Sequence, residues 1–202
     1  MPTHTQCQCQ QIITLFDELF LETDNTRLLC ALCDGRHGKL DEPVYEPANT
    51  QRTHHQIVFA HGYFASALHE ISHWCVAGKA RRLLEDFGYW YRPDGRSQQQ
   101  QTEFEKVEVK PQALEWLFSL ASQHKFVASA DNLAGETCDD LAFRLAVAAQ
   151  ARAYFTHGLP SQAALLLSKL QQCYGGQVTL DQLYWPEEGA DECPEETPTN
   201  AA

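Results

Sequence analysis

The chain has 202 residues, of which 44% are hydrophobic and 10% aromatic, with 27 Asp and Glu against 15 Lys and Arg. This length predicts one folded domain with a buried core. The net charge of −12 argues against a general nucleic-acid binder and against docking on anionic membranes, because both need a basic surface. We find no secretory leader and no apolar run long enough to cross a bilayer, so we expect a cytoplasmic protein.

The first half of the chain contains signals for two helices and one strand. Apolar residues at helical spacing predict an amphipathic helix over residues 6–21. Residues 22–55 are polar and contain several glycines and prolines, so we expect a loop-rich stretch. The β-branched and aromatic residues of 56–60 predict a buried strand. A helix should follow from about 64 to 77 and end at Gly78.

The second half is predicted to be mostly helical. Aromatic and turn residues alternate over 86–96, which predicts an irregular segment. A helix is expected over 97–121, with a kink or a new start at Pro111. Two further helices and a short last helix with a capping box are predicted at 139–156, 161–174 and Thr179 to Gln182. The fold class is therefore α+β, a mostly helical single domain with three or four short strands.

The last sixteen residues differ in composition from the rest. They carry six acidic and no basic side chains, and they contain no aromatic residue. A segment of this kind cannot form a core and is predicted to be a disordered acidic tail. We therefore expect the folded domain to occupy residues 1–186 and the tail 187–202.

Cys30 and Cys33 form a C-x-x-C pair, and His37 follows closely. One such pair is half of a zinc ribbon, and a structural zinc site would need a second half. The sequence contains no second C-x-x-C pair. Incidental free thiols in a loop are therefore the favoured interpretation, with a small zinc site as the alternative.

The strongest chemical signal is His69-Glu70-Ile71-Ser72-His73, an H-E-x-x-H motif inside the predicted helix over 64–77. Histidines four residues apart lie on one helical face, with Cβ atoms about 5–6 Å apart, so both imidazoles can bind one metal ion. Glu70 points about 100° around the helix, beside the ion. Two core histidines without a metal are the alternative, which is less favourable because each would need its own buried partner.

A third protein ligand is expected from a carboxylate later in the chain. Glu108 is favoured because valines frame it on a predicted helix, and Glu115, Glu105 and Asp86 stay as alternatives. Two histidines and one carboxylate suit two chemistries. With zinc they form a hydrolase in which Glu70 activates water, and with Fe(II) they form an oxygenase.

Four other residues are candidates for contacting a substrate. His61 lies at the end of the predicted strand, and Tyr89 and Tyr91 flank a tryptophan in an aromatic cluster that could receive an aliphatic cation. Arg81 belongs to a basic cluster after the H-E-x-x-H helix and could meet an acidic partner. For each of them a turn, core or surface role is the simpler reading.

Several blocks of the sequence resemble one protein family. They are IVFAHGYFASALHEISHWCVAGKARR at 57–82, DFGYWYRPDGR at 86–96 and FEKVEVKPQALEWLF at 104–118, with shorter matches at 131–133 and 184–186. Together they resemble the elongation factor P hydroxylase family (EpmC, formerly YfcM) over about residues 8–187. The stretch at 30–39 is longer than the family's loop, and the acidic tail is additional.

The resemblance implies a non-haem Fe(II) hydroxylase that uses O₂ to hydroxylate the β-lysylated lysine of translation elongation factor P. It also implies a fold similar to that of the YbeY metalloprotein, with a 2-His-1-carboxylate site. His69 and His73 match the imidazole ligands, and Glu108 matches the carboxylate. Zinc or another divalent ion can occupy such a site during purification. A requirement for 2-oxoglutarate stays open.

The alternative function is a zinc-dependent hydrolase, either an H-E-x-x-H peptidase or a YbeY-like ribonuclease. The acidic chain disfavours RNA as a substrate. We therefore expect elongation factor P as the partner, and neither direct contact with nucleic acid nor a membrane.

Overall fold

The computed structural model describes residues 4–32, 42–88, 96–129 and 140–185, so the predicted tail lies outside the described residues. Within these ranges the fold is α+β and mostly helical, as predicted. The helices are α1 (His4–Phe20), α2 (Phe64–Val76), α3 (Gln98–Ala121), α4 (Asp140–His157) and α5 (Ser161–Tyr174). The strands are β1 (Thr26–Cys30), β2 (Val44–Glu46) and β3 (His55–Phe59), and the short 3-10 helices are Arg81–Leu83, Glu85–Gly88 and Leu180–Leu183.

The three strands form one small sheet in the order β1-β3-β2. The central strand β3 pairs parallel with β1 and antiparallel with β2, so Ile57 lies opposite both Leu28 and Tyr45. The predicted strand at 56–60 is confirmed. The prediction of a loop-rich stretch at 22–55 is wrong for β1 and β2, which are short strands that depend on pairing with β3 rather than on local sequence.

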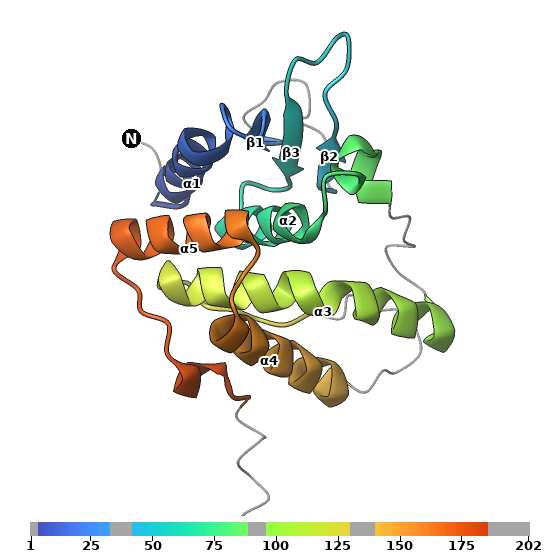
Figure 1. Ribbon diagram of the computed structural model, residues 1–202, viewed down its shortest axis with the longest axis vertical. Helices are drawn as coiled ribbons and strands as arrows, with labels where there is room; N and C mark the ends of the chain where they lie inside the picture. Colours follow the sequence, from blue (N-terminus) through green and yellow to red (C-terminus); the bar gives the residue numbers. More distant parts are fainter. Residues whose placement is uncertain (1–3, 33–41, 89–95, 130–139, 186–202) are drawn as a thin grey trace, which may run out of the picture.

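The elements are arranged in layers (Figure 1). The sheet lies at one end of the molecule, and α2, α3 and α4 follow below it in that order, while α1 packs against β1 and α2. Helix α5 runs beside α2 and α3. Because α2 and α3 are adjacent layers, their facing sides meet in the interior of the protein.

One side of α2 is anchored in the core, as its apolar residues predict. Leu68, Ile71 and Trp74 are fully buried there. The Trp74 ring contacts Phe16 and Phe20 of α1, at centroid distances of 5.2 and 4.9 Å. These contacts fix the rotation of α2 and turn its other side, which carries His69 and His73, toward α3.

Helix α3 begins with a capping box in which Ser97 and Gln100 exchange hydrogen bonds. The helix continues through Pro111, so of the two predicted alternatives, a kink or a new start, the structure excludes the new start. Burial of both flanking turns against α2 and α4 outweighs the loss of one backbone hydrogen bond. The buried side of α3 carries several polar side chains, which is unusual for a core-facing helix. They belong to Gln101, Glu108, Gln112, Glu115 and Ser119.

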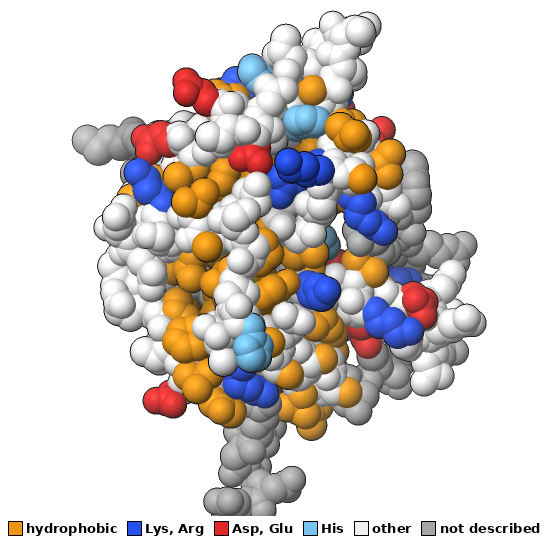
Figure 2. Space-filling model, in the orientation of Figure 1, with side chains coloured by type: hydrophobic (Ala, Val, Ile, Leu, Met, Phe, Trp, Pro, Cys, Tyr) orange, Lys and Arg blue, Asp and Glu red, His pale blue; other side chains and the backbone are white. Residues whose placement is uncertain are grey.

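The surface seen in Figure 2 has acidic and basic side chains interspersed, with hydrophobic side chains gathered over the helical layers. Some large apolar residues are exposed, among them Phe155 of α4, Leu165 of α5 and Tyr184, which follows the last 3-10 helix. Among the described residues, none of the helices combines the length and the apolar character that a membrane span requires.

Candidate metal centre

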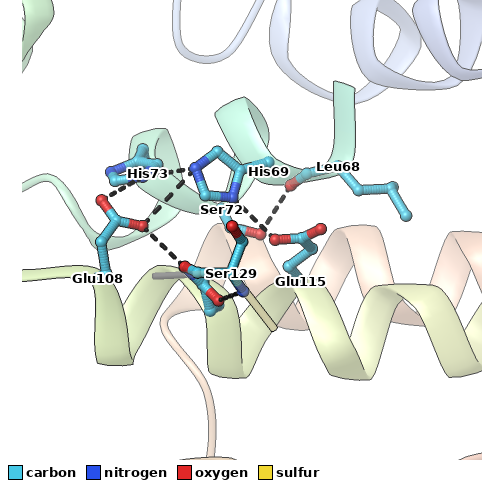
Figure 3. A network of polar contacts seen from close by, with 8 residues as sticks. Leu68, His69, Ser72, His73, Glu108, Glu115 and Ser129 are labelled. Carbon is cyan, nitrogen blue, oxygen red and sulfur yellow. Dashed lines mark hydrogen bonds and ion pairs between the residues drawn. The ribbon is translucent and has the colours of Figure 1, made fainter. Parts of the chain in front are cut away.

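Two histidines of α2 converge at the boundary between α2 and α3. The spacing of four residues places His69 and His73 on one side of the helix, and their Nε2 atoms lie 3.1 Å apart (Figure 3). The side chain of His69 is 27% exposed and that of His73 is 12% exposed. Solvent therefore reaches the pair mainly at His69.

Glu108 of α3 faces both imidazoles from the opposite layer. Its Oε1 atom lies 3.2 Å from His73 Nε2, and its Oε2 atom lies 3.7 Å from His69 Nε2. The three residues each offer a ligand atom, and these atoms all lie within 4.8 Å of one another. This spacing is compatible with a shared metal ion, and the donor set of two imidazoles and one carboxylate suits zinc or iron.

The charges of the metal-free site are set by this arrangement. Burial alone would lower the pKa of His69, but the carboxylates of Glu115, Glu108 and Glu70 outweigh it and raise that pKa to about 10. Burial alone would raise the pKa of Glu108, but His73 and His69 outweigh it and lower that pKa to about 2. Without a metal, the site therefore holds a protonated His69 beside an ionised Glu108 at neutral pH.

Metal affinity should increase with pH, because a metal ion must displace the proton of His69. Between about pH 6 and pH 8, affinity should rise about tenfold per pH unit for one displaced proton. Calorimetric titration with Co(II) in buffers of different ionisation enthalpy measures this proton release. A pH-independent affinity would contradict it.

The same pKa shift affects the stability of the metal-free protein. The ion pair of His69 with the neighbouring carboxylates stabilises the fold fully below the ordinary histidine pKa of 6.5, and this stabilisation is lost as the pH rises through about 10.

Glu115 lies on the far side of His69 from Glu108. Its Oε2 atom is 2.8 Å from His69 Nδ1 (Figure 3), and its side chain is 11% exposed. Nδ1 therefore donates its proton to this carboxylate, which leaves Nε2 as the nitrogen available for a metal ion. The sequence offered Glu115 as an alternative ligand, whereas the structure places it against Nδ1 of His69, the ring nitrogen farther from Glu108.

Substitution of Glu115 by leucine should weaken metal binding by about 10–100-fold, because His69 then loses the partner that orients its ring. Titration with Co(II) measures the loss. Glu103→Gln on the same helix is the matched control, since Glu103 is 68% exposed and pairs only with Lys106 among the contacts that the structure gives it. Equal affinities for Glu115→Leu and Glu103→Gln would show that Glu115 does not support His69.

The structure places the remaining acidic candidates outside the group of three. Asp86 accepts a hydrogen bond from the Tyr45 backbone N–H at 2.8 Å, and Glu105 accepts one from Gln101 at 3.0 Å. Glu70 is half-buried beside the histidines. Burial raises its pKa, and the two imidazoles offset part of this effect.

Of the four residues predicted to contact a substrate, the structure describes His61 and Arg81. His61 is exposed in a left-handed turn after β3, with its ring 5.7 Å from that of Tyr63. Arg81 is exposed and donates a hydrogen bond to the Phe87 carbonyl at 3.1 Å, so it links the two 3-10 helices that follow α2. Tyr89 and Tyr91 lie outside the described residues.

The C-x-x-C pair is only partly described. Cys30 is a buried free cysteine at the end of β1, whereas Cys33 and His37 lie outside the described residues. The Sγ atom of Cys30 faces Gly62, and a Cβ added at Gly62 would lie 3.6 Å from that sulfur. Cys30 is therefore part of the packing between β1 and the turn that leads to α2.

Sequence reasoning missed Gln112. The residue is 3% exposed, and its Nε2 atom donates to Glu108 Oε2 at 3.3 Å and to the Ser129 carbonyl at 2.7 Å. The spacing of four residues from Glu108 was the available signal, since such side chains meet on a helix. A glutamine at this spacing is too common to indicate a site without the structure.

Comparison with known proteins places the chain in a family. A sequence profile of the elongation factor P hydroxylases (EpmC) matches residues 15–184. The chain is also 50% identical over 165 residues to the elongation factor P lysine hydroxylase of Haemophilus influenzae, a match that covers 82% of this chain and 88% of that protein. The predicted resemblance is therefore confirmed, and the chain belongs to the elongation factor P hydroxylase family.

Proposed function

We propose that this protein is a non-haem Fe(II) hydroxylase that adds a hydroxyl group to the β-lysylated lysine of elongation factor P. His69, His73 and Glu108 would hold the iron. The observation that carries the proposal is the convergence of these three side chains, with ligand atoms within 4.8 Å of one another, in a member of this family.

The donor set supports iron chemistry as well as zinc chemistry. Two imidazoles and one carboxylate leave several coordination positions open, and Fe(II) bound in this way activates O₂ for oxygenation. The relative from Haemophilus influenzae is named a lysine hydroxylase, which favours oxygenation over hydrolysis. The protein's own contribution is to fix three ligands on two packed helices and to keep Glu108 away from water.

The acidic surroundings suit a substrate with a long cationic side chain. Glu70, Glu108 and Glu115 bring three carboxyl groups to a site with two histidines. A metal ion and the imidazoles would offset the negative charges of Glu108 and Glu115. We therefore assign Glu70 to contact the substrate ammonium or to orient O₂. His61 and Arg81, on the segments before and after α2, are proposed contacts for the substrate protein.

The mass of the substrate tests this function. The full-length protein is loaded anaerobically with Fe(II), mixed with β-lysylated elongation factor P and exposed to O₂, with and without 2-oxoglutarate. The arm without 2-oxoglutarate contains a chemical reductant, so that both arms supply the two electrons that reduce the second oxygen atom of O₂ to water. Intact-mass spectrometry should show the gain of one oxygen atom, and omission of Fe(II) or O₂ should prevent it. Comparison of the 2-oxoglutarate arms identifies whether this co-substrate is the source of electrons.

The rival functions give different results when a model peptide and an RNA are assayed beside elongation factor P. A zinc hydrolase would cleave a peptide or RNA and leave the mass of elongation factor P unchanged. A zinc-binding module without catalytic activity would bind the metal and change none of these substrates. Either result would overturn the proposed hydroxylase activity.

A further inference from the structure

The side-chain amide of Gln112 is fully engaged between the candidate metal centre and the segment that follows α3. Its Oε1 atom accepts a hydrogen bond from the Ser129 backbone N–H at 3.0 Å, while its Nε2 atom donates to the Ser129 carbonyl at 2.7 Å. The second hydrogen of Nε2 is directed to Glu108 Oε2 at 3.3 Å. One buried amide thus joins a peptide group and a carboxylate.

This network fixes the orientation of the amide. If the oxygen and nitrogen of Gln112 were exchanged, an oxygen would face both Glu108 and the Ser129 carbonyl, and a nitrogen would face the Ser129 N–H. All three contacts would then be repulsive. The pairing with Ser129 therefore holds Nε2 as a donor toward Glu108.

The consequence falls on the two oxygens of Glu108 unequally. Oε2 accepts the hydrogen bond from Gln112 and lies 3.7 Å from His69 Nε2. Oε1 lies closer to a ring nitrogen, 3.2 Å from His73 Nε2. A hydrogen bond from a neighbouring side chain restricts the direction in which a ligating carboxylate presents its oxygens. It also occupies one lone pair of the oxygen that accepts it. Glu108 is thereby directed to offer one oxygen, not two.

We infer that Gln112 is a positioning residue that reserves Oε2 of Glu108 and leaves Oε1 as the single oxygen offered to the metal ion. This inference rests on the proposed metal site. Coordination through one oxygen keeps more positions of the metal open for O₂ and substrate. The anchor on Ser129 also links the geometry of this ligand to the segment after α3.

The test uses Co(II), whose visible absorption intensity reports coordination number, on the full-length protein. Gln112→Met removes the donor and preserves most of the volume. Loss of the hydrogen bond that orients Glu108 should weaken Co(II) binding by about 10–100-fold. Because Oε2 is then released to coordinate, the coordination number and with it the absorption intensity should also change. In a Glu108→Ala background the same substitution should alter neither quantity, since Gln112 acts through Glu108.

Gln101→Met is the matched control. Gln101 is another buried glutamine of α3, 2% exposed and hydrogen-bonded to Arg96 and Glu105. Its substitution should lower thermal stability without altering the Co(II) spectrum or affinity. If Gln112→Met does not fold, Gln112→Asn, whose shorter amide cannot span Glu108 and Ser129 together, supplies the same comparison.

The outcomes separate this inference from the proposed function. Wild-type affinity and spectrum in the Gln112 variant would overturn the inference, and so would an equal loss in the Glu108→Ala background, which would mean a merely structural role. If Glu108→Ala alone binds Co(II) as tightly as the wild type, the proposed metal site itself is wrong.

Discussion

Replacement of His73 by alanine is expected to abolish hydroxylation and to reduce Fe(II) binding severely. His73 Nε2 is central to the candidate site, 3.1 Å from His69 Nε2 and 3.2 Å from Glu108 Oε1. Loss of a direct ligand should exceed the roughly 10–100-fold loss in affinity that removal of a supporting residue causes. Anaerobic Fe(II) titration and the intact mass of elongation factor P measure the two effects.

His54→Ala is the control for this substitution. His54 pairs with Asn25 in an exposed loop before β3, at 2.6 Å, and its removal should change neither iron affinity nor product formation. Circular dichroism on both variants separates misfolding from ligand loss. Product formation by a folded His73→Ala variant at the wild-type rate would contradict the assigned site.

Substitution of Trp74 by alanine should give the largest loss of stability among single changes near the site. Trp74 is fully buried, and its ring contacts Phe16, Phe20 and the guanidinium of Arg82, whose Cζ atom lies 3.9 Å from the ring centroid. Such a deletion costs about 3–5 kcal/mol. In a chain of this size, each kcal/mol lowers the melting temperature by about 2–4 °C.

Urea denaturation of the metal-free protein measures the change. Leu83→Ala is the control, because Leu83 is 67% exposed and its loss should change the free energy of unfolding by less than about 0.5 kcal/mol. Trp74→Phe should retain most of the stability, since it keeps an aromatic ring between α1 and α2. A loss below about 1 kcal/mol for Trp74→Ala would show that α1 does not hold α2 in place.

The candidate site was predictable where local pattern and chemistry coincide. The H-E-x-x-H spacing by itself places His69 and His73 on one helical side, and the apolar residues opposite them indicate which side is buried. The apolar neighbours of Glu108 favoured it over the other acidic residues, although Glu115, Glu105 and Asp86 stayed as alternatives. The structure brings it to the histidines because α3 packs directly on α2.

The rest depends on contacts between distant parts of the chain. Strands β1 and β2 are short and lie in a stretch of sequence that is mostly polar, so only their pairing with β3 identifies them. The role of Glu115 depends on which ring nitrogen of His69 it meets, and the role of Gln112 on a peptide group seventeen residues later. No local pattern specifies such geometry.

The position of bound iron tests the metal centre most directly. Crystals of the full-length protein are soaked anaerobically with Fe(II), and anomalous diffraction is collected at the iron absorption edge. The proposed site predicts a peak within bonding distance of His69 Nε2, His73 Nε2 and Glu108 Oε1. A peak elsewhere, for example beside Cys30, with none between these three side chains, would contradict it.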